Sequence, residues 1–146
     1  MTIKNMNDND LTEVYRISAV TLLIKNMKTS CSFYSQIPGF KLVYGGSSND
    51  TFTTFEIGEH IPRDYLNLEL YDTTTNNYAR NHFGRIIFHT EDVDKLYLYM
   101  KSNSNFSNII SFEDEPRDAS WGERYFHIRE PDGYQLSFAM PIKSKT

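Results

Sequence analysis

The stretch REPDGYQLSFAMP, residues 129–141, is typical of a tight turn followed by a short strand. Pro131 fixes φ, Asp132 can bond to the nearby backbone and Gly133 tolerates a positive φ, so these residues favour the turn. Side chains alternate between the two faces of a strand. One face carries Tyr134, Leu136, Phe138 and Met140, and the other carries Gln135, Ser137 and Ala139. A core accounts for the apolar face, whereas the small, mildly polar face of Ser137 needs another explanation.

The chain around this stretch reads as two similar halves. Hydrophobic periodicity predicts a strand, an amphipathic helix and three strands in the first half, and the same order in the second. The first set is 17–24, helix 27–37 ending at Pro38-Gly39, then 40–44, 51–57 and 65–71. The second set is 83–89, helix 93–100 with Thr90 or Asp92 as N-cap, then 108–113, 123–129 and 134–140. A repeat of this size indicates duplication, with two modules packing together.

These elements predict an α+β protein with one globular domain over residues 15–141. Module one covers 15–72, a polar linker covers 73–82 and module two covers 83–141. Residues 1–14 are rich in Asn and Asp and are expected to form a flexible N-terminal tail, and residues 142–146 to form a C-terminal tail.

Four of the predicted strands have one apolar face and one mixed face. On strand 17–24, Val20, Leu22 and Ile24 oppose Ala19, Thr21 and Leu23. The mixed faces of the other three strands hold Tyr65, Asn67, Glu69 and Tyr71, then Arg85, Ile87 and His89, then Gln135, Ser137 and Ala139. An ordinary exposed face would carry more Lys and fewer aromatic residues, so the pattern favours a cleft for a small ligand.

Composition excludes several classes of function. The net charge is −4, which argues against a nucleic-acid partner. The single cysteine excludes an internal disulfide framework. No apolar run approaches the roughly 20 residues of a membrane span, and the polar start has no apolar signal core. We therefore expect a cytoplasmic protein that binds neither nucleic acid nor membrane.

Three stretches resemble the vicinal oxygen chelate superfamily, which includes glyoxalase I, bleomycin-resistance proteins and extradiol dioxygenases. VTLLIKNMKTSCSFYSQIPGFKL (20–42) resembles the opening of its first module, and FGRIIFHTEDVDKLYLYM (83–100) resembles the start of its second. WGERYFHIREPDGYQLSFAMP (121–141) resembles its close. The resemblance implies two βαβββ modules forming an open half-barrel sheet around a cleft, with helices on the outer face. It also implies a homodimer.

Enzymes of this superfamily hold a divalent metal with four side chains, one from the first and one from the last strand of each module, typically His, Gln or Glu. Carried over by the resemblance, the positions fall on Ala19, Glu69, Arg85 and Ser137. Ala19 has no donor atom, Arg85 is a permanent cation and Ser137 is a poor ligand when neutral. One carboxylate does not hold a transition metal alone. We therefore expect no metal and no other cofactor.

Arg85 has two interpretations. It can form an ion pair with Glu69 that keeps the cleft electrically satisfied. It can also bind an anionic ligand in bidentate fashion, and the two roles are compatible. His127 likewise is either a structural hydrogen-bonding residue or a ligand contact, and Trp121 either caps the cleft or fixes its loop. The candidate ligand-binding residues are Thr21, Asn67, Glu69, Tyr71, Arg85, Ile87, Trp121, Tyr125, His127, Gln135 and Ser137.

Three functional interpretations follow, and the first is preferred. It is a glyoxalase-like or bleomycin-resistance-like protein that binds a small anionic or aromatic molecule without a metal. The second is a lyase, isomerase or dioxygenase with a non-standard metal site, or with metal-free acid–base chemistry through Glu69 and His127. The third is a non-catalytic structural or regulatory module whose cleft is filled by its own side chains. The sequence leaves open whether any turnover occurs.

Overall fold

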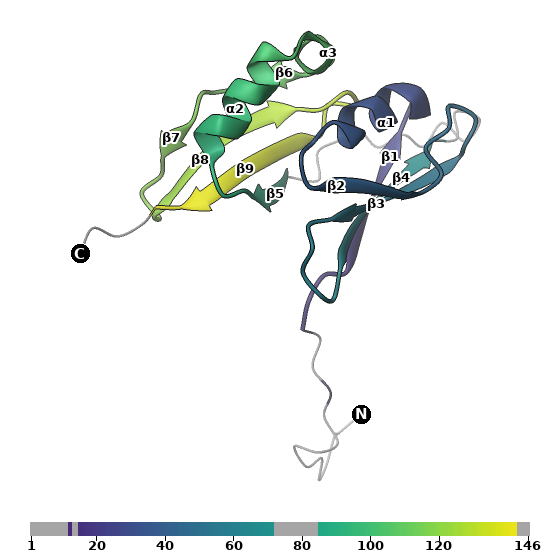
Figure 1. The fold of residues 1–146 in the computed structure, drawn as a ribbon, viewed down its shortest axis with the longest axis horizontal. Helices are drawn as coiled ribbons and strands as arrows, with labels where there is room; N and C mark the ends of the chain where they lie inside the picture. The colour runs from purple at the N-terminus through teal and green to yellow at the C-terminus, as the bar shows by residue number, and fades with distance from the viewer. Residues whose placement is uncertain (1–11, 13–14, 72–84, 143–146) are drawn as a thin grey trace, which may run out of the picture.

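The fold is described by a computed structural model, shown in Figure 1, which covers residue 12, residues 15–71 and residues 85–142. The predicted linker 73–82 and nearly all of both predicted tails lie outside the described residues. Within them the predicted α+β class is confirmed, because two open sheets of mixed strand direction each carry helices on one face (Figure 1).

The first sheet contains all the strands of the first half. Its strands are β1 (Ala19–Ile24), β2 (Phe40–Tyr44), β3 (Phe52–Ile57) and β4 (Asp64–Leu70), in the spatial order β1-β4-β3-β2. β1 pairs with β4 in parallel, and the other pairs are antiparallel. Helix α1 (Met27–Ser35) makes the crossover that a parallel pair requires. Its N-cap is Asn26, whose side chain accepts a hydrogen bond from the Thr29 N–H at 3.0 Å.

The second sheet repeats this order with additions. Strand β5 (Arg85–His89) pairs in parallel with β9 (Gln135–Pro141), which is antiparallel to β8 (Glu123–Arg129). Helix α2 (Val93–Ser102) connects β5 to the rest, and its N-cap is Asp92, not Thr90. Two short strands, β6 (Ser111–Phe112) and β7 (Arg117–Asp118), pair with β8.

The predicted strand 108–113 was wrong in its first half. Residues Ser104–Ser107 form helix α3. The backbone continues in a turn after this helix, in which the Ile109 N–H donates to the Phe106 carbonyl at 3.3 Å. Asn103 caps this helix and Phe106 is fully buried, so capping and burial stabilise a turn that apolar patterning alone does not reveal. β7 was not predicted either.

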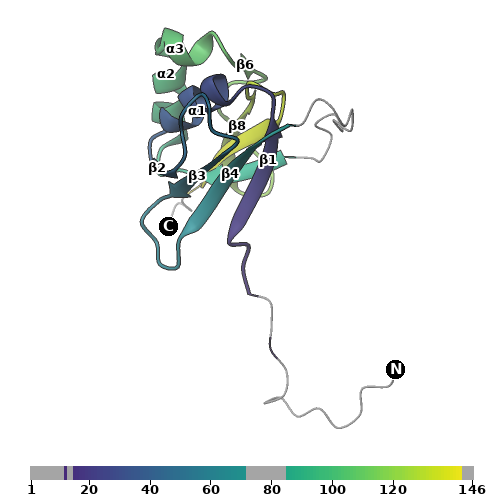
Figure 2. The same cartoon turned by 90° about the vertical axis from the view of Figure 1, so that its right-hand side faces the viewer.

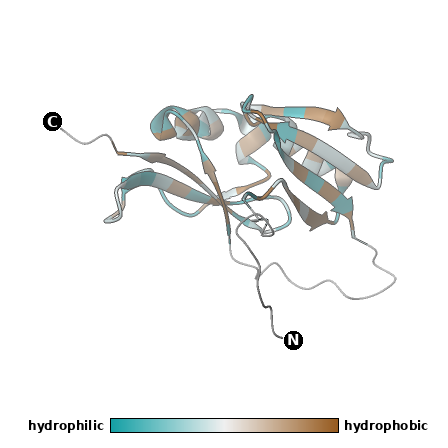
Figure 3. Cartoon of the chain, turned by 90° about the horizontal axis from the view of Figure 1, so that it is seen from below, coloured by the Kyte–Doolittle hydropathy of each residue, from teal (hydrophilic) through white to brown (hydrophobic). Residues whose placement is uncertain are grey.

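The core lies between the helices and the sheets. The helices cover the same side of the molecule in Figures 1 and 2, and apolar and polar bands alternate along the strands in Figure 3. The predicted apolar faces are buried or partly buried, with one exception: Leu70, at the end of β4, is 37% exposed. Core residues from both halves include Leu22, Ile24, Phe33, Tyr34, Phe55, Leu66, Leu68, Phe106, Phe126, Leu136 and Phe138. In the described residues we find no helix long and apolar enough to cross a membrane.

Candidate functional site

The strand registers correct one predicted position. Thr21 and Ile87 each lie five residues before an N-cap, Asn26 and Asp92, so they are equivalent in the two modules. Thr21 pairs with Asn67, and Ile87 pairs with Ser137. The counterpart of Ser137 in module one is therefore Asn67. Glu69 pairs with Leu23, and its counterpart in module two is Ala139.

With this correction, the positions to which the resemblance assigns metal ligands are Ala19, Asn67, Arg85 and Ser137. They offer a methyl group, an amide, a guanidinium and a hydroxyl. The guanidinium is a permanent cation, and no carboxylate, imidazole or thiolate stands at any of the four positions. This donor set does not fit a divalent metal. Across the described residues, moreover, no group of three or more His, Cys, Asp or Glu side chains is placed to hold one.

The predicted ion pair between Glu69 and Arg85 is not formed in the described part of the chain. Glu69 is exposed near the end of β4, between Leu23 on β1 and Phe52 on β3. Arg85 is the first residue of β5, on the other sheet. The prediction was wrong because the counterpart of Ser137 is Asn67, and Glu69 is the next residue along the same face of β4.

Arg85 instead reaches across β9 to His127 on β8. Its Nη1 lies 3.4 Å from His127 Nε2. Burial is the largest cause that lowers the pKa of His127, and the charge of Arg85 lowers it further, whereas Asp114 raises it. The imidazole is therefore neutral at neutral pH, with Nε2 as acceptor for Arg85 and the proton assigned to Nδ1. Nδ1 is buried and has no hydrogen-bond partner among the described residues.

Arg85 differs from the other described arginines in its partner. Each of the others lies within 3.4 Å of at least one carboxylate: Arg16 of Asp64, Arg63 of Glu56, Arg117 of Asp114, Arg124 of Asp94 and Asp118, and Arg129 of Glu113. Within the described ranges, Arg85 has no such carboxylate. A guanidinium presents five N–H donors, and one acceptor nitrogen leaves most of them available.

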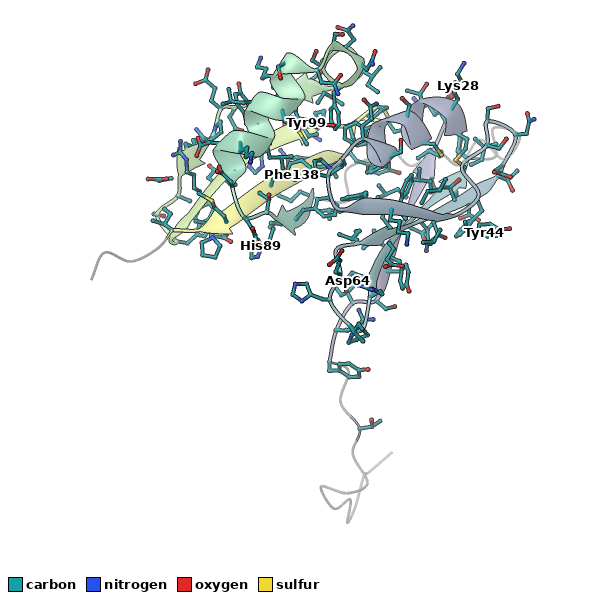
Figure 4. All side chains as sticks on the ribbon, viewed as in Figure 1. Lys28, Tyr44, Asp64, His89, Tyr99 and Phe138 are labelled. Carbon is teal, nitrogen blue, oxygen red and sulfur yellow. The ribbon has the colours of Figure 1, made fainter. Side chains whose placement is uncertain are left out.

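Aromatic rings continue from His127 along β8. The ring centroids of Tyr125 and His127 are 4.8 Å apart, and Trp121 stacks on Tyr125 at 5.7 Å. Trp121 is 66% exposed, yet its indole N–H donates to Glu123 at 2.9 Å. The other carboxylate oxygen of Glu123 lies 2.9 Å from His89 Nε2. Figure 4 shows His89 on the side of the sheet away from the helices.

The strand between these side chains is lined by small residues. Ser137 and Ala139 on β9 are only 3% and 1% exposed, although they lie on the face predicted to line an open cleft. They pair with His127 and Tyr125 on one side and with Ile87 and His89 on the other. These larger neighbours flank a narrow strip of small side chains. Gln135, at the start of β9, donates to Glu113 at 2.7 Å.

A second group lies on the first sheet. Thr54, Asn67 and Thr21 form a hydrogen-bonded row across β3, β4 and β1, with distances of 2.7 and 3.2 Å. Tyr71 follows the end of β4, where its N–H donates to the Ile24 carbonyl at 2.7 Å. The predicted site residues thus fall into one group on each sheet. The second sheet gathers Arg85, Ile87, Trp121, Tyr125, His127, Gln135 and Ser137.

Two hollows of the described surface lie elsewhere. One, of about 560 Å³, lies between α1 and α3 and is lined by Lys28, Thr29, Ser32, Ser35, Gln36, Asn105 and Ile109. The other, of about 890 Å³, lies at the N-terminal end of α2 and includes Asp94, Asp118, Arg124 and Met140. Neither hollow is lined by a predicted ligand-binding residue.

The sequence analysis missed several residues that frame the second-sheet group. Glu123 shares a strand face with Tyr125 and His127, so strand alternation was a signal that could have identified it. Asp114, which accepts the His127 backbone N–H at 2.6 Å, and Arg117, which donates to the Tyr125 hydroxyl at 2.9 Å, had no comparable signal. The segment that holds them, which ends in β7, lies next to β8 only in the folded chain.

The family model described as Glyoxalase/Bleomycin resistance protein/Dioxygenase superfamily matches residues 16–138. No curated protein matches the chain. A superfamily member from Sphaerobacter thermophilus is 19% identical with a TM-score of 0.61, covering 86% of this chain and 97% of its own. A glyoxalase/bleomycin resistance protein/dioxygenase from Nocardioides is 17% identical with a TM-score of 0.64, covering 93% and 89%.

A glyoxalase-related enzyme from Fulvimarina pelagi is 14% identical with a TM-score of 0.64, covering 86% of this chain and 88% of its own. At these identities the likeness shows the fold alone. The family model, however, spans most of the chain. The chain therefore belongs to the glyoxalase/bleomycin resistance protein/dioxygenase superfamily.

Proposed function

We propose that this protein binds a small organic anion, without a metal, on the open face of the second sheet. The anionic group binds Arg85, and a planar part of the ligand contacts the rings of Tyr125 and Trp121. The observation that carries the proposal is the partner of Arg85. Within the described residues the guanidinium lies beside a neutral imidazole and not beside a carboxylate.

Charge and geometry support this assignment. A guanidinium binds a carboxylate through two parallel N–H donors, and such charge-assisted bonds are stronger than neutral ones. The neutral His127 holds Arg85 by one bond and does not neutralise it. The indole of Trp121 is exposed and fixed by Glu123, so a ring that stacks on it orders few further side chains.

Binding without turnover is the form of the proposal that needs the fewest groups. The catalytic alternative requires either a metal, which the donor set does not fit, or a proton-transfer pair. Glu69 and His127, the pair predicted from sequence, lie on different sheets and are not hydrogen-bonded to each other in the described chain. No observation favours this alternative.

One observation favours a second candidate, a structural module whose cleft is filled by its own side chains. Ser137 and Ala139 are buried, and the contacts of Arg85 with His127 and of His89 with Glu123 join β5 to β8 on either side of them. In this candidate these contacts and the aromatic rings have a structural role only.

Benzoate and benzamide separate the two candidates, because they have the same ring and differ in charge. We expect benzoate to raise the melting temperature and to shift amide NMR signals of β5 and β8, and benzamide to do neither. Arg85→Ala abolishes both effects, and Arg85→Lys weakens them because it removes the two-donor geometry. Arg63→Ala is the matched control, since Arg63 pairs with Glu56 on the other sheet.

Equal benzoate responses in Arg85→Ala and in the wild type contradict the proposal. No response to benzoate, salicylate or phthalate supports the filled module instead. Elemental analysis of protein purified without a tag tests the metal-free part, and one tightly held metal ion per chain overturns it.

We also propose that the protein is a cytoplasmic homodimer, as the sequence and the resemblance lead us to expect. Exposed apolar side chains on the open sheet faces support the dimer, since Leu23 is 39% and Ile87 is 57% exposed. Sedimentation equilibrium tests this, and a monomer at micromolar concentration contradicts it.

A further inference from the structure

The turn between β8 and β9 buries two carboxylates against the other module. Glu130 is 3% exposed and Asp132 is 8% exposed. Both belong to module two, yet their side chains contact α1 and the residues before it in module one. Buried carboxylates are uncommon unless a cation or several hydrogen bonds compensate them.

Hydrogen bonds fasten Glu130 in place. One of its oxygens accepts from the Tyr34 hydroxyl of α1 at 3.0 Å. The other accepts from the backbone N–H groups of Asp132 at 2.6 Å and Tyr134 at 3.2 Å. The carboxyl group thus joins the helix of one module to the turn of the other.

Asp132 and Tyr134 add further links between the modules. The Asp132 carboxylate accepts from the Lys25 backbone N–H at 2.9 Å and from the Ser30 hydroxyl at 3.1 Å. The Tyr134 hydroxyl donates to the Leu23 carbonyl at 2.8 Å. This set of contacts, which we name the turn joint, consists of Glu130, Asp132 and Tyr134 with Leu23, Lys25, Ser30 and Tyr34.

The charged and polar groups around Glu130 come from three parts of the chain. Asp132 lies on its own turn, Tyr34 and Ser30 lie on α1, and Lys25 lies between β1 and α1. The described salt bridges give Glu130 no cation. Burial, followed by the charge of Asp132, raises the pKa of Glu130 to about 7. Burial also raises the pKa of Asp132, although the charge of Lys25 opposes this, and the pKa of Tyr34 rises for the same reason.

We propose that the turn joint is a protonation-dependent latch between the two modules. When Glu130 is neutral, Asp132 carries the one negative charge of the two and the turn packs tightly on α1. When Glu130 is ionised, two buried carboxylates repel each other and the turn is held less tightly. The same turn connects the strands that carry His127 and Ser137, so loosening the joint also loosens that part of the second sheet.

The sign of the pH effect follows from linkage. The pKa of Glu130 is higher in the folded protein than its ordinary value of 4.5. Its stabilising contribution is therefore complete below about pH 4.5 and is lost as the pH rises through about 7. Most carboxylates in folded proteins produce the opposite trend, because their pKa values are lowered.

Urea unfolding of the wild type and of Glu130→Gln between pH 4.5 and 8.5 tests the latch. Glutamine keeps the shape and mimics the neutral acid, because its amide can donate to the Tyr34 oxygen while its carbonyl accepts the two backbone N–H bonds. We expect the unfolding constant of the wild type, divided by that of the variant, to rise about 100-fold over this range. Glu59→Gln, an exposed site in module one, is the control and should leave the wild-type pH profile unchanged.

Exchange of the Lys25 amide hydrogen gives a local readout, since its N–H donates to Asp132. Its protection factor should fall between pH 5.5 and 8 in the wild type and stay constant in Glu130→Gln. If Glu130→Gln does not fold, Tyr34→Phe replaces it. The Tyr34 hydroxyl lowers the pKa of Glu130, so this variant should move the transition to higher pH. Parallel pH profiles for the wild type and Glu130→Gln, or a transition in Tyr34→Phe at lower pH, overturn the proposal.

Discussion

At the level of single residues, the chemistry of the open sheet face depends on Arg85. Arg85 places a permanent cation where the resemblance places a metal ligand, so under the proposed function this face attracts an anion directly. His127 does not add to or cancel this charge, because its lowered pKa leaves it neutral beside Arg85. The pair therefore carries the single positive charge of Arg85, which forms no salt bridge with a carboxylate among the described residues.

The pKa of His127 can be measured by NMR titration of its ring proton. We expect a midpoint below the ordinary 6.5, because burial and the Arg85 charge disfavour the imidazolium. Arg85→Ala should raise the midpoint, and Asp114→Asn should lower it further, since Asp114 favours the charged form. Opposite shifts in the two variants distinguish charge effects from a general change in packing. Shifts in the same direction contradict this electrostatic description.

The same lowered pKa has a consequence for stability. A histidine with a depressed pKa in the folded state contributes stability above pH 6.5 that is lost as the pH falls through the folded value. His127→Asn should therefore unfold with a weaker dependence on pH between 6.5 and 5 than the wild type. Urea midpoints across that range test this. An unchanged slope contradicts it.

At the level of elements, the register of parallel strands decided what the sequence pattern could not. Alternation along strand 65–71 correctly grouped Tyr65, Asn67 and Glu69 on one face. Alternation repeats every two residues, however, so it cannot choose which member of the face lies opposite Thr21. The pairing of β1 with β4 selects Asn67, and this moves Glu69 away from the predicted site.

Two glycines provide a test of local backbone geometry. Gly45, after β2, has φ 73°, and Gly58, after β3, has φ 68°. A methyl group on Gly45 would collide with the backbone carbonyl of Phe52, whereas one on Gly58 meets open space. Gly58→Ala should cost about 1 kcal/mol for the left-handed backbone. Gly45→Ala should cost about 2 kcal/mol more, because the β2–β3 hairpin must also shift.

Urea unfolding of both variants measures the difference. The pair shares almost the same φ, so the comparison separates steric contact from backbone strain. Equal losses of stability in the two variants would mean that the hairpin adapts without cost.

At the level of the whole molecule, the two modules share one core. The rings of Phe33 on α1 and Phe106 on α3 meet edge to face with centroids 5.0 Å apart, and Phe40 meets Phe88 at 5.5 Å. The Tyr99 hydroxyl of α2 also donates to the Gln36 carbonyl at 2.9 Å. Together with the turn joint, these contacts oppose independent motion of the halves.

A double-mutant cycle tests the shared core. Phe33→Leu and Phe106→Leu should show a coupling energy of about 1 kcal/mol, because each loses the other's ring edge. Phe33→Leu with Phe126→Leu is the control, since Phe126 contacts Tyr97 and Phe138 in its own module. The control pair should be additive within about 0.5 kcal/mol. Additivity of Phe33 with Phe106 contradicts coupling across the modules.

The sequence by itself determined the order of the elements and their buried faces, because these depend on local periodicity. It predicted the turn at residues 130–133, the two longer helices and most strands within a few residues, but missed α3 and β7. It also identified Arg85, Tyr125 and His127 as members of one face, since strand alternation fixes that membership.

Only the tertiary structure decided which side chains meet. Strand register decides that Arg85 contacts His127 and that Asn67, not Glu69, is the counterpart of Ser137. Asp114 and Arg117 reach β8 because folding brings together segments that are distant in the sequence. The same holds for Glu130, which the sequence presents as an ordinary turn carboxylate. Folding removes it from water and places it against Tyr34, and desolvation, a property of the whole packed molecule, gives it a pKa near neutrality.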